Sequence, residues 1–113
     1  MKVDVRFRGL DASAALRDHA EKRVFFHLSR FGSELSAVVV RIADLNGPKG
    51  GVDKRCHVVV RGRRIGSSTL DDVSHDPYVC VEQAIERAGA TVGRLLDRER
   101  TMLRRAGPSR RAS

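Results

Sequence analysis

Four arginines near the C-terminal end of the chain have a spacing that suits them to bind phosphate groups. Arg87, Arg94, Arg98 and Arg105 are separated by seven, four and seven residues, so on a helix they lie within about 20° of one line. A guanidinium group makes bidentate contacts with phosphate oxygens, and a row about 27 Å long can follow several phosphates of a nucleic acid. The alternative is a solvated helix face, although like charges at this spacing repel one another.

The charge of the whole chain favours a polyanionic partner. The 113 residues carry a formal net charge of +8, and the part from Arg87 onward holds eight arginines against Asp97 and Glu99. Such a balance is typical of proteins that bind nucleic acid or an anionic membrane surface. The last helix turns its apolar side inward and offers no exposed Trp or Leu for insertion, so we interpret the charge as nucleic-acid binding rather than membrane binding.

Neither a membrane span nor a secretion signal is expected. No apolar run approaches the roughly 18 residues of a membrane span, and the first ten residues alternate in polarity. We therefore expect a cytoplasmic protein. Cys56 and Cys80 lie far apart and lack the CxxC spacing of zinc or redox sites, so we interpret both as thiols. A site formed by Cys56, His57, His75 and Cys80 remains open at this point.

The sequence predicts a protein that is not an enzyme and uses no cofactor, metal or small-molecule substrate. His75 lies near Asp71, Asp72 and Asp76, which could suggest acid–base or metal chemistry. These carboxylates precede a helix, however, where capping of backbone N–H groups is their usual role. There is also no nucleophile with a base and no Gly-rich loop before a helix.

Hydrophobic periodicity divides the chain into strands and helices. The alternation of "KVDVRFR" predicts a strand, and helical spacing follows, with Asp11 or Ser13 as N-cap and Gly32 as a left-handed C-cap. "NGPKGG" (Asn46–Gly51) predicts a hairpin connection with Lys49 at a mobile basic tip. The predicted elements are a strand at 2–8, a helix at 12–30, a strand at 34–45, two strands within 53–70 joined by a turn at 61–64, and a helix from a cap at Asp76 to about Arg105.

This order predicts an α+β fold, β-α-β-β-β-α, in which two helices cover one face of a four-stranded sheet. We expect residues 1–105 to form the domain and residues 106–113 a disordered basic tail. The last helix is expected to bury a stripe that ends with Met102 and Leu103, and its Gly89 and Gly93 to mark close packing against the sheet or a mobile last third. The uncovered face of the sheet is expected to be basic and without aromatic side chains, through Lys2, Arg6, Arg8, Arg41, Arg55, His57 and Arg61.

Two segments on either side of the central strands carry a family resemblance. "ALRDHAEKRVFFHLSRF" (Ala15–Phe31) and "DPYVCVEQAIERAGATVGRLLDRERTML" (Asp76–Leu103) resemble the ribosome hibernation-promoting factor and ribosome-associated inhibitor family, also known as sigma-factor modulation proteins. The resemblance implies a fold similar to double-stranded RNA-binding domains. It also implies a stationary-phase stress-response factor that binds the rRNA of the small ribosomal subunit in the mRNA–tRNA channel and silences idle ribosomes.

The resemblance extends the expected RNA-binding surface to the first helix, where Arg23 and Arg30 match basic or polar positions of the family. Nothing after Ser113 supplies the second domain of long members, so the resemblance fits a short form, a truncated chain or a divergent member. We expect the protein to be monomeric off the ribosome. The alternatives are a general duplex-RNA-binding module and a regulator that binds an acidic protein.

Overall fold

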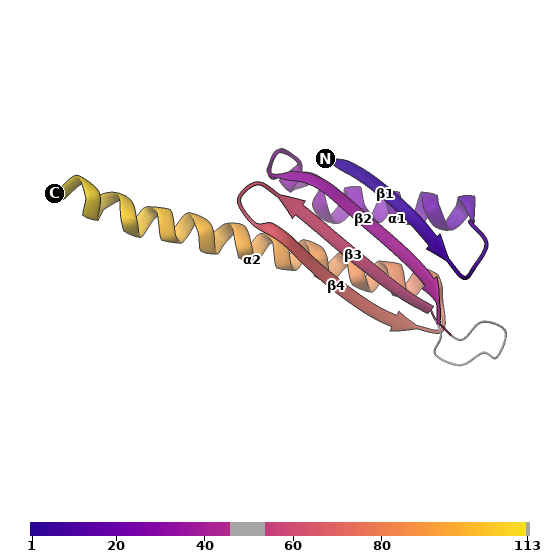
Figure 1. Cartoon of the computed structure of the whole chain (residues 1–113). Coiled ribbons are helices and arrows are strands. Elements are labelled where there is room, and N and C mark those ends of the chain that lie inside the picture. Colours follow the sequence, from indigo (N-terminus) through magenta and orange to yellow (C-terminus); the bar gives the residue numbers. More distant parts are fainter. Residues whose placement is uncertain (46–53, 113) are drawn as a thin grey trace.

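The computed structural model describes residues 1–45 and 54–112, with side chains up to Arg105. The described residues confirm the predicted α+β order (Figure 1). The predicted connection at Asn46–Gly51, with its basic tip at Lys49, lies outside them. The elements are β1 (Lys2–Arg8), α1 (Ala14–Leu28), a 3₁₀ helix η1 (Ser29–Glu34), β2 (Leu35–Asp44), β3 (Lys54–Gly62), β4 (Gly66–Ser74) and α2 (Pro77–Ala112).

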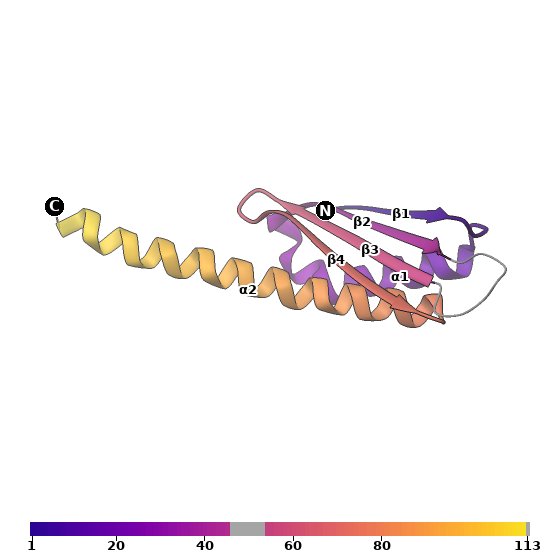
Figure 2. The same cartoon turned by 60° about the horizontal axis from the view of Figure 1, so that its bottom comes forward.

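The four strands form one mixed sheet in the order β1-β2-β3-β4. β1 pairs with β2 in parallel because α1 carries the chain across between them, whereas the β2-β3 and β3-β4 pairs are antiparallel. Both helices lie on one face of the sheet, and the other face is open (Figure 2). The inward alternation of the strands supplies the core, with Val38, Val40 and Ile42 of β2 fully buried. The open face is therefore free to carry polar side chains.

The helix starts follow the predicted caps, but the end of α1 does not. Ser13 Oγ accepts the backbone N–H of Leu16 at 3.1 Å, and Asp76 Oδ1 accepts that of Tyr78 at 2.8 Å. The left-handed C-cap at Gly32 is wrong, since the positive-φ glycines of the described residues are Gly9 and Gly66. The chain tightens after Leu28 into η1, which contains Gly32, so no left-handed residue is needed to leave the helix.

The α2 helix extends past the sheet. Its backbone continues to Ala112, beyond the predicted end near Arg105, and its C-terminal part projects alone (Figure 1). The predicted burial of Met102 and Leu103 is wrong, because they are 64% and 52% exposed and Leu96 is the last buried residue of the stripe. The division into a domain of residues 1–105 and a tail of residues 106–113 stays a prediction.

Candidate nucleic-acid interface

The four arginines of α2 form one exposed row along the helix, which we call the arginine row (Arg87, Arg94, Arg98 and Arg105). Arg87 locates it: its Nη1 donates to the Asp71 carbonyl oxygen at 2.8 Å and lies 3.9 Å from Asp72 Oδ1, so the row starts beside β4. Arg94 donates to Thr91 Oγ1 of its own helix at 3.2 Å. Within the described part of the chain, Arg98 and Arg105 make no ion pair. The C-terminal three arginines therefore keep their charge available to a ligand.

The two arginines predicted on α1 lie elsewhere. Arg23 is half-buried between the helices, with its Nε 2.6 Å from Glu82 Oε2 and its guanidinium 4.4 Å above the Phe26 ring. Arg30 is exposed in η1 and stacks over Phe31 at 4.6 Å. A Cβ on Gly93 would lie 3.6 Å from Phe31, and Gly93 is about 120° around α2 from the arginine row. Arg30 and the arginine row therefore lie on different faces.

A polar cluster holds α1 to α2. Glu82 of α2 faces three side chains of α1: Arg23, His19 with Nε2 at 3.8 Å from Oε2, and His27 with Nε2 at 3.6 Å from Oε1. Close packing accompanies this cluster, since a Cβ on Gly89 would lie 3.0 Å from the His27 carbonyl oxygen. Gly89 therefore marks close packing against α1, which differs from both predicted alternatives, packing against the sheet and a mobile last third. This contact fixes the direction of α2 and hence of the arginine row.

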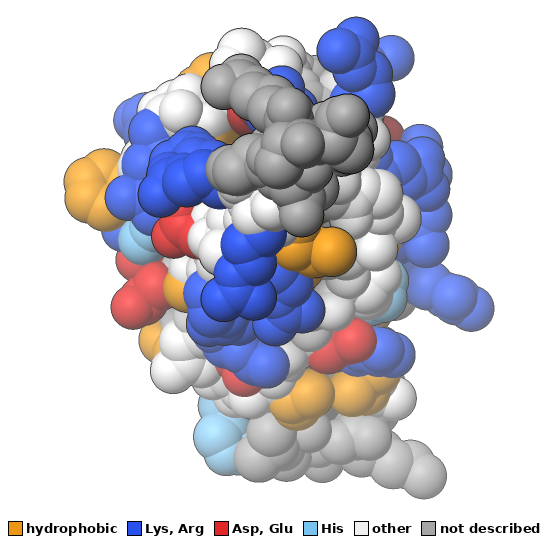
Figure 3. Space-filling view, turned by 90° about the vertical axis from the view of Figure 1, so that its left-hand side faces the viewer, with side chains coloured by type: hydrophobic (Ala, Val, Ile, Leu, Met, Phe, Trp, Pro, Cys, Tyr) orange, Lys and Arg blue, Asp and Glu red, His pale blue; other side chains and the backbone are white. Residues whose placement is uncertain are grey.

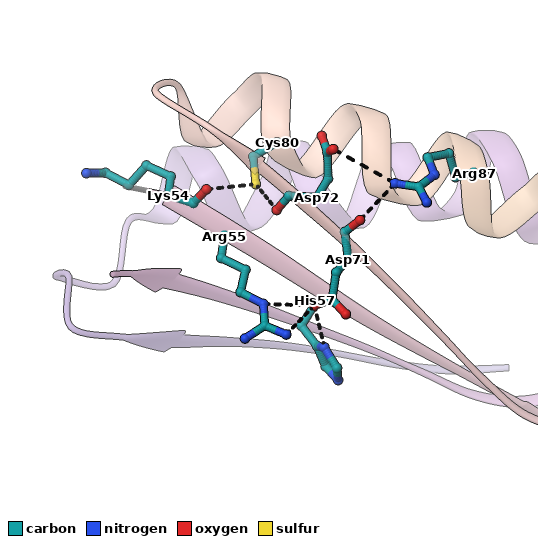
Figure 4. A network of polar contacts seen from close by, with 7 residues as sticks. All are labelled: Lys54, Arg55, His57, Asp71, Asp72, Cys80 and Arg87. Carbon is teal, nitrogen blue, oxygen red and sulfur yellow. Dashed lines mark hydrogen bonds and ion pairs between the residues drawn. The ribbon is translucent and has the colours of Figure 1, made fainter. Parts of the chain in front are cut away.

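The open face of the sheet is basic, as the alternation predicts. Lys2, Arg6, Arg8, Arg41, Arg55 and Arg61 are exposed there, and His57 is partly exposed. Asp71 of β4 lies on the same face and accepts hydrogen bonds from Arg55 Nε at 2.9 Å and His57 Nδ1 at 2.8 Å (Figure 4). The His57 hydrogen bond, followed by the one from Arg55, holds the pKa of the Asp71 carboxyl below its usual value.

The residues that could suggest metal or acid–base chemistry do not converge. Cys56 is buried in the core, whereas His57, next to it on β3, points to the open face, so the four-residue site left open by the sequence does not form. The Cys80 thiol donates to the Asp72 carbonyl oxygen at 3.1 Å (Figure 4), and a hydrogen bond with Cys80 together with burial raises the pKa of the Cys56 thiol. The described residues contain no group of three or more His, Cys, Asp or Glu placed to hold a metal ion.

The fold and these faces define a small α+β domain whose cations are displayed on a helix flank and on an open sheet. The chain belongs to the family described as sigma 54 modulation protein / S30EA ribosomal protein, whose sequence profile matches residues 3–100. This membership confirms the predicted family. It also confirms that the protein is not an enzyme, because the family is non-enzymatic.

The fold is shared with a number of solved structures. A ribosomal subunit interface protein from Coxiella burnetii superposes with a TM-score of 0.69 at 18% identity, over 83% of this chain and 96% of that chain. The N-terminal domain of Protein Y from Thermus thermophilus gives a TM-score of 0.69 at 23% identity, over 83% of this chain and 98% of that chain. No curated protein sequence matches significantly. No helix among the described residues has the length and hydrophobicity needed to span a bilayer.

Proposed function

We propose that this domain binds the rRNA of the small ribosomal subunit in the mRNA–tRNA channel and thereby silences idle ribosomes. Membership of a ribosomal protein family supports a ribosomal partner, and one structural neighbour is itself a ribosomal subunit interface protein. Ribosome binding places the protein in the cytoplasm, where we expect it in stationary phase and under stress. The observation that carries the proposal is the arginine row.

The arginine row suits an RNA backbone better than a flexible basic tail would. The helix holds its guanidinium groups at a fixed rise of about 1.5 Å per residue, so several phosphates can be contacted without ordering a disordered chain. The C-terminal part of α2 projects beyond the sheet (Figure 1), and Lys and Arg side chains gather in several groups on this end of the molecule (Figure 3). Arg98 and Arg105 lose no ion pair to a described residue on binding RNA.

The other predicted arginines take different parts in this proposal. Arg87 is tied to Asp71 and Asp72, so it orients the start of the row as well as contacting phosphate. Arg23 is committed to Glu82 and acts mainly by holding the helices together. Arg30 of η1 can contact RNA separately, because it lies on a different face of the molecule from the arginine row.

The test compares two pairs of charge reversals on the same helix. Arg94→Glu with Arg98→Glu changes the arginine row, whereas Arg100→Glu with Arg104→Glu makes the same change of charge about 140° and 100° around the helix from the line of the row. The measurement is co-sedimentation of each folded variant with separated small and large subunits at low and high salt, with a duplex RNA competitor present. We expect salt-sensitive binding to the small subunit that survives the competitor and is lost only with the first pair.

Other outcomes separate the alternatives. Displacement by the competitor would indicate a general duplex-RNA-binding module, and no association with either subunit would indicate an acidic protein partner. Equal losses for the two pairs would mean that net charge, rather than the arginine row, determines binding. Persistence of small-subunit binding in the first pair would show that another surface is used.

A further inference from the structure

The open sheet face contains a hollow of about 390 Å³, which we call the basic hollow. The basic hollow results from the way residues on neighbouring strands are paired. Arg6, Arg41 and His57 lie opposite one another in one cross-strand row, and Arg8, Ala43 and Arg55 in the next. The small side chain of Ala43 between two arginines leaves space that a larger residue would fill. The lining residues are Arg6, Phe7, Arg8, Arg41, Ala43, Arg55 and His57.

The charges around the basic hollow are only partly compensated. Asp4 Oδ2 lies 2.7 Å from Arg6 Nε, and the Asp71 carboxylate pairs with both Arg55 and His57. Arg8 and Arg41 make no ion pair within the described ranges 1–45 and 54–112. Arg41 also lies directly opposite Arg6 on the neighbouring strand, a like-charged pairing that destabilises a sheet. An anion seated between these groups would remove that repulsion.

The surroundings define the kind of anion. The described strands place no Phe, Tyr or Trp on the open face for stacking against a base, and the Phe7 ring packs against the core and under the Arg17 guanidinium, 5.2 Å from its centroid. The arginines of the basic hollow are exposed, so they reach a ligand that passes over the face rather than one enclosed within it. These features fit a sugar–phosphate backbone recognised through its phosphates.

We propose that the basic hollow binds a phosphate of an RNA backbone and that the open sheet face is a second RNA-binding surface. It lies across the sheet from the helices, so an RNA segment bound there is distinct from one bound along the arginine row. Arg8 and Arg41 supply the uncompensated charge, and Ala43 supplies the room. The inference does not depend on the proposed function, because none of its residues lies on α2.

The test measures binding of the full chain to a short fluorescent single-stranded RNA of mixed sequence, by anisotropy over a range of salt concentrations. Arg8→Glu with Arg41→Glu removes the uncompensated charge. Lys2→Glu with Arg61→Glu is the matched control, since both residues are exposed on the same face outside the basic hollow. We expect the first pair to lower the affinity for RNA about tenfold or more. The slope of log affinity against log salt concentration should become shallower by about 0.7 for each phosphate that is no longer neutralised. The control pair should have a smaller effect on both quantities.

Ala43→Ile separates shape from charge. Isoleucine favours a strand and fills the basic hollow without changing any charge, so we expect it to weaken RNA binding while the circular dichroism spectrum stays unchanged. Unaltered binding by this variant, or equal losses for the two charge-reversal pairs, would overturn the proposal. Displacement of the RNA by ATP at equal phosphate concentration would also overturn it, by showing a site for free nucleotide. Repeating the series in the Arg94→Glu, Arg98→Glu background keeps this result separate from the arginine row.

Discussion

Two glycines of α2, four residues apart, are expected to respond differently to the same substitution. A Cβ on Gly89 would lie 3.0 Å from the carbonyl oxygen of His27 and 3.2 Å from its Cβ. A Cβ on Gly93 would meet only the Phe31 Cζ, at 3.6 Å, which is an ordinary van der Waals contact. The two positions share a helix and differ in the space that the neighbouring element leaves.

The magnitudes follow from two opposing terms. Replacing an interior helical glycine by alanine stabilises a helix by about 1 kcal/mol. At Gly93 nothing opposes this gain, so Gly93→Ala should raise the free energy of unfolding by about that amount. At Gly89 the new methyl group pushes against the backbone of the last turn of α1, and overpacking of this kind costs about 1–3 kcal/mol. Gly89→Ala should therefore be neutral to about 2 kcal/mol less stable than the wild type.

Urea denaturation followed by circular dichroism measures the difference between the two variants. We expect Gly93→Ala to be the more stable by about 1–3 kcal/mol, and its melting temperature to exceed that of the wild type by roughly 4 °C. Equal stabilisation by both substitutions would refute the reasoning, because it would mean that α1 and α2 do not pack closely at Gly89. Neither position belongs to the arginine row, so RNA binding should persist in both folded variants.

Three further outcomes test the polar contacts. Glu82→Ala should lower the free energy of unfolding in urea by about 1–3 kcal/mol, because it leaves the basic side chains of α1 without their carboxylate; an unchanged midpoint would contradict this. Asp71, whose pKa is lowered mainly by His57, stabilises the fold above the unfolded carboxyl pKa of about 3.9, and this stabilisation is lost as the pH falls through the lower folded pKa. Asp71→Asn should therefore weaken the acid dependence of stability below about pH 4, and an unaltered acid limb would argue against the contact. Cys56 and Cys80 are fully buried, so iodoacetamide at about pH 8 should modify them in urea but not in the native protein, as judged by mass spectrometry.

The first three strands could be predicted closely because alternation reports directly on one-sided burial. β4 was predicted less well, since it continues from the predicted end at residue 70 to Ser74 and includes Asp71 and Asp72, which were expected to cap the helix. Val38, Val40 and Ile42 face the helices as their pattern indicates, and Arg41 between them is exposed. The same alternation identified the basic open face. It did not reveal the basic hollow, since that depends on Ala43 lying opposite both Arg8 and Arg55, a register that no single strand encodes.

The helices were predicted less completely because helical periodicity identifies an apolar side but not what covers it. Met102 and Leu103 continue the stripe of α2, yet they lie beyond the sheet and remain exposed. The helical periodicity also did not predict which side chains contact each other between different elements. The spacing of the arginine row was evident, whereas the contact of Arg87 with β4 and that of Arg23 with Glu82 depend on tertiary packing.

The two proposed RNA surfaces approach each other at β4. The acidic residues of this strand determine whether one RNA segment can bind to both surfaces. Asp71 holds Arg55 on the open face with its carboxylate and Arg87 with its carbonyl oxygen, while Asp72 adds negative charge on the helix side (Figure 4). A single strand passing over this edge would bring phosphates close to two carboxylates, which repel them. Two separate RNA segments avoid that repulsion. We therefore expect the reversals at Arg8 and Arg41 and those at Arg94 and Arg98 to reduce ribosome affinity by independent factors that multiply when combined.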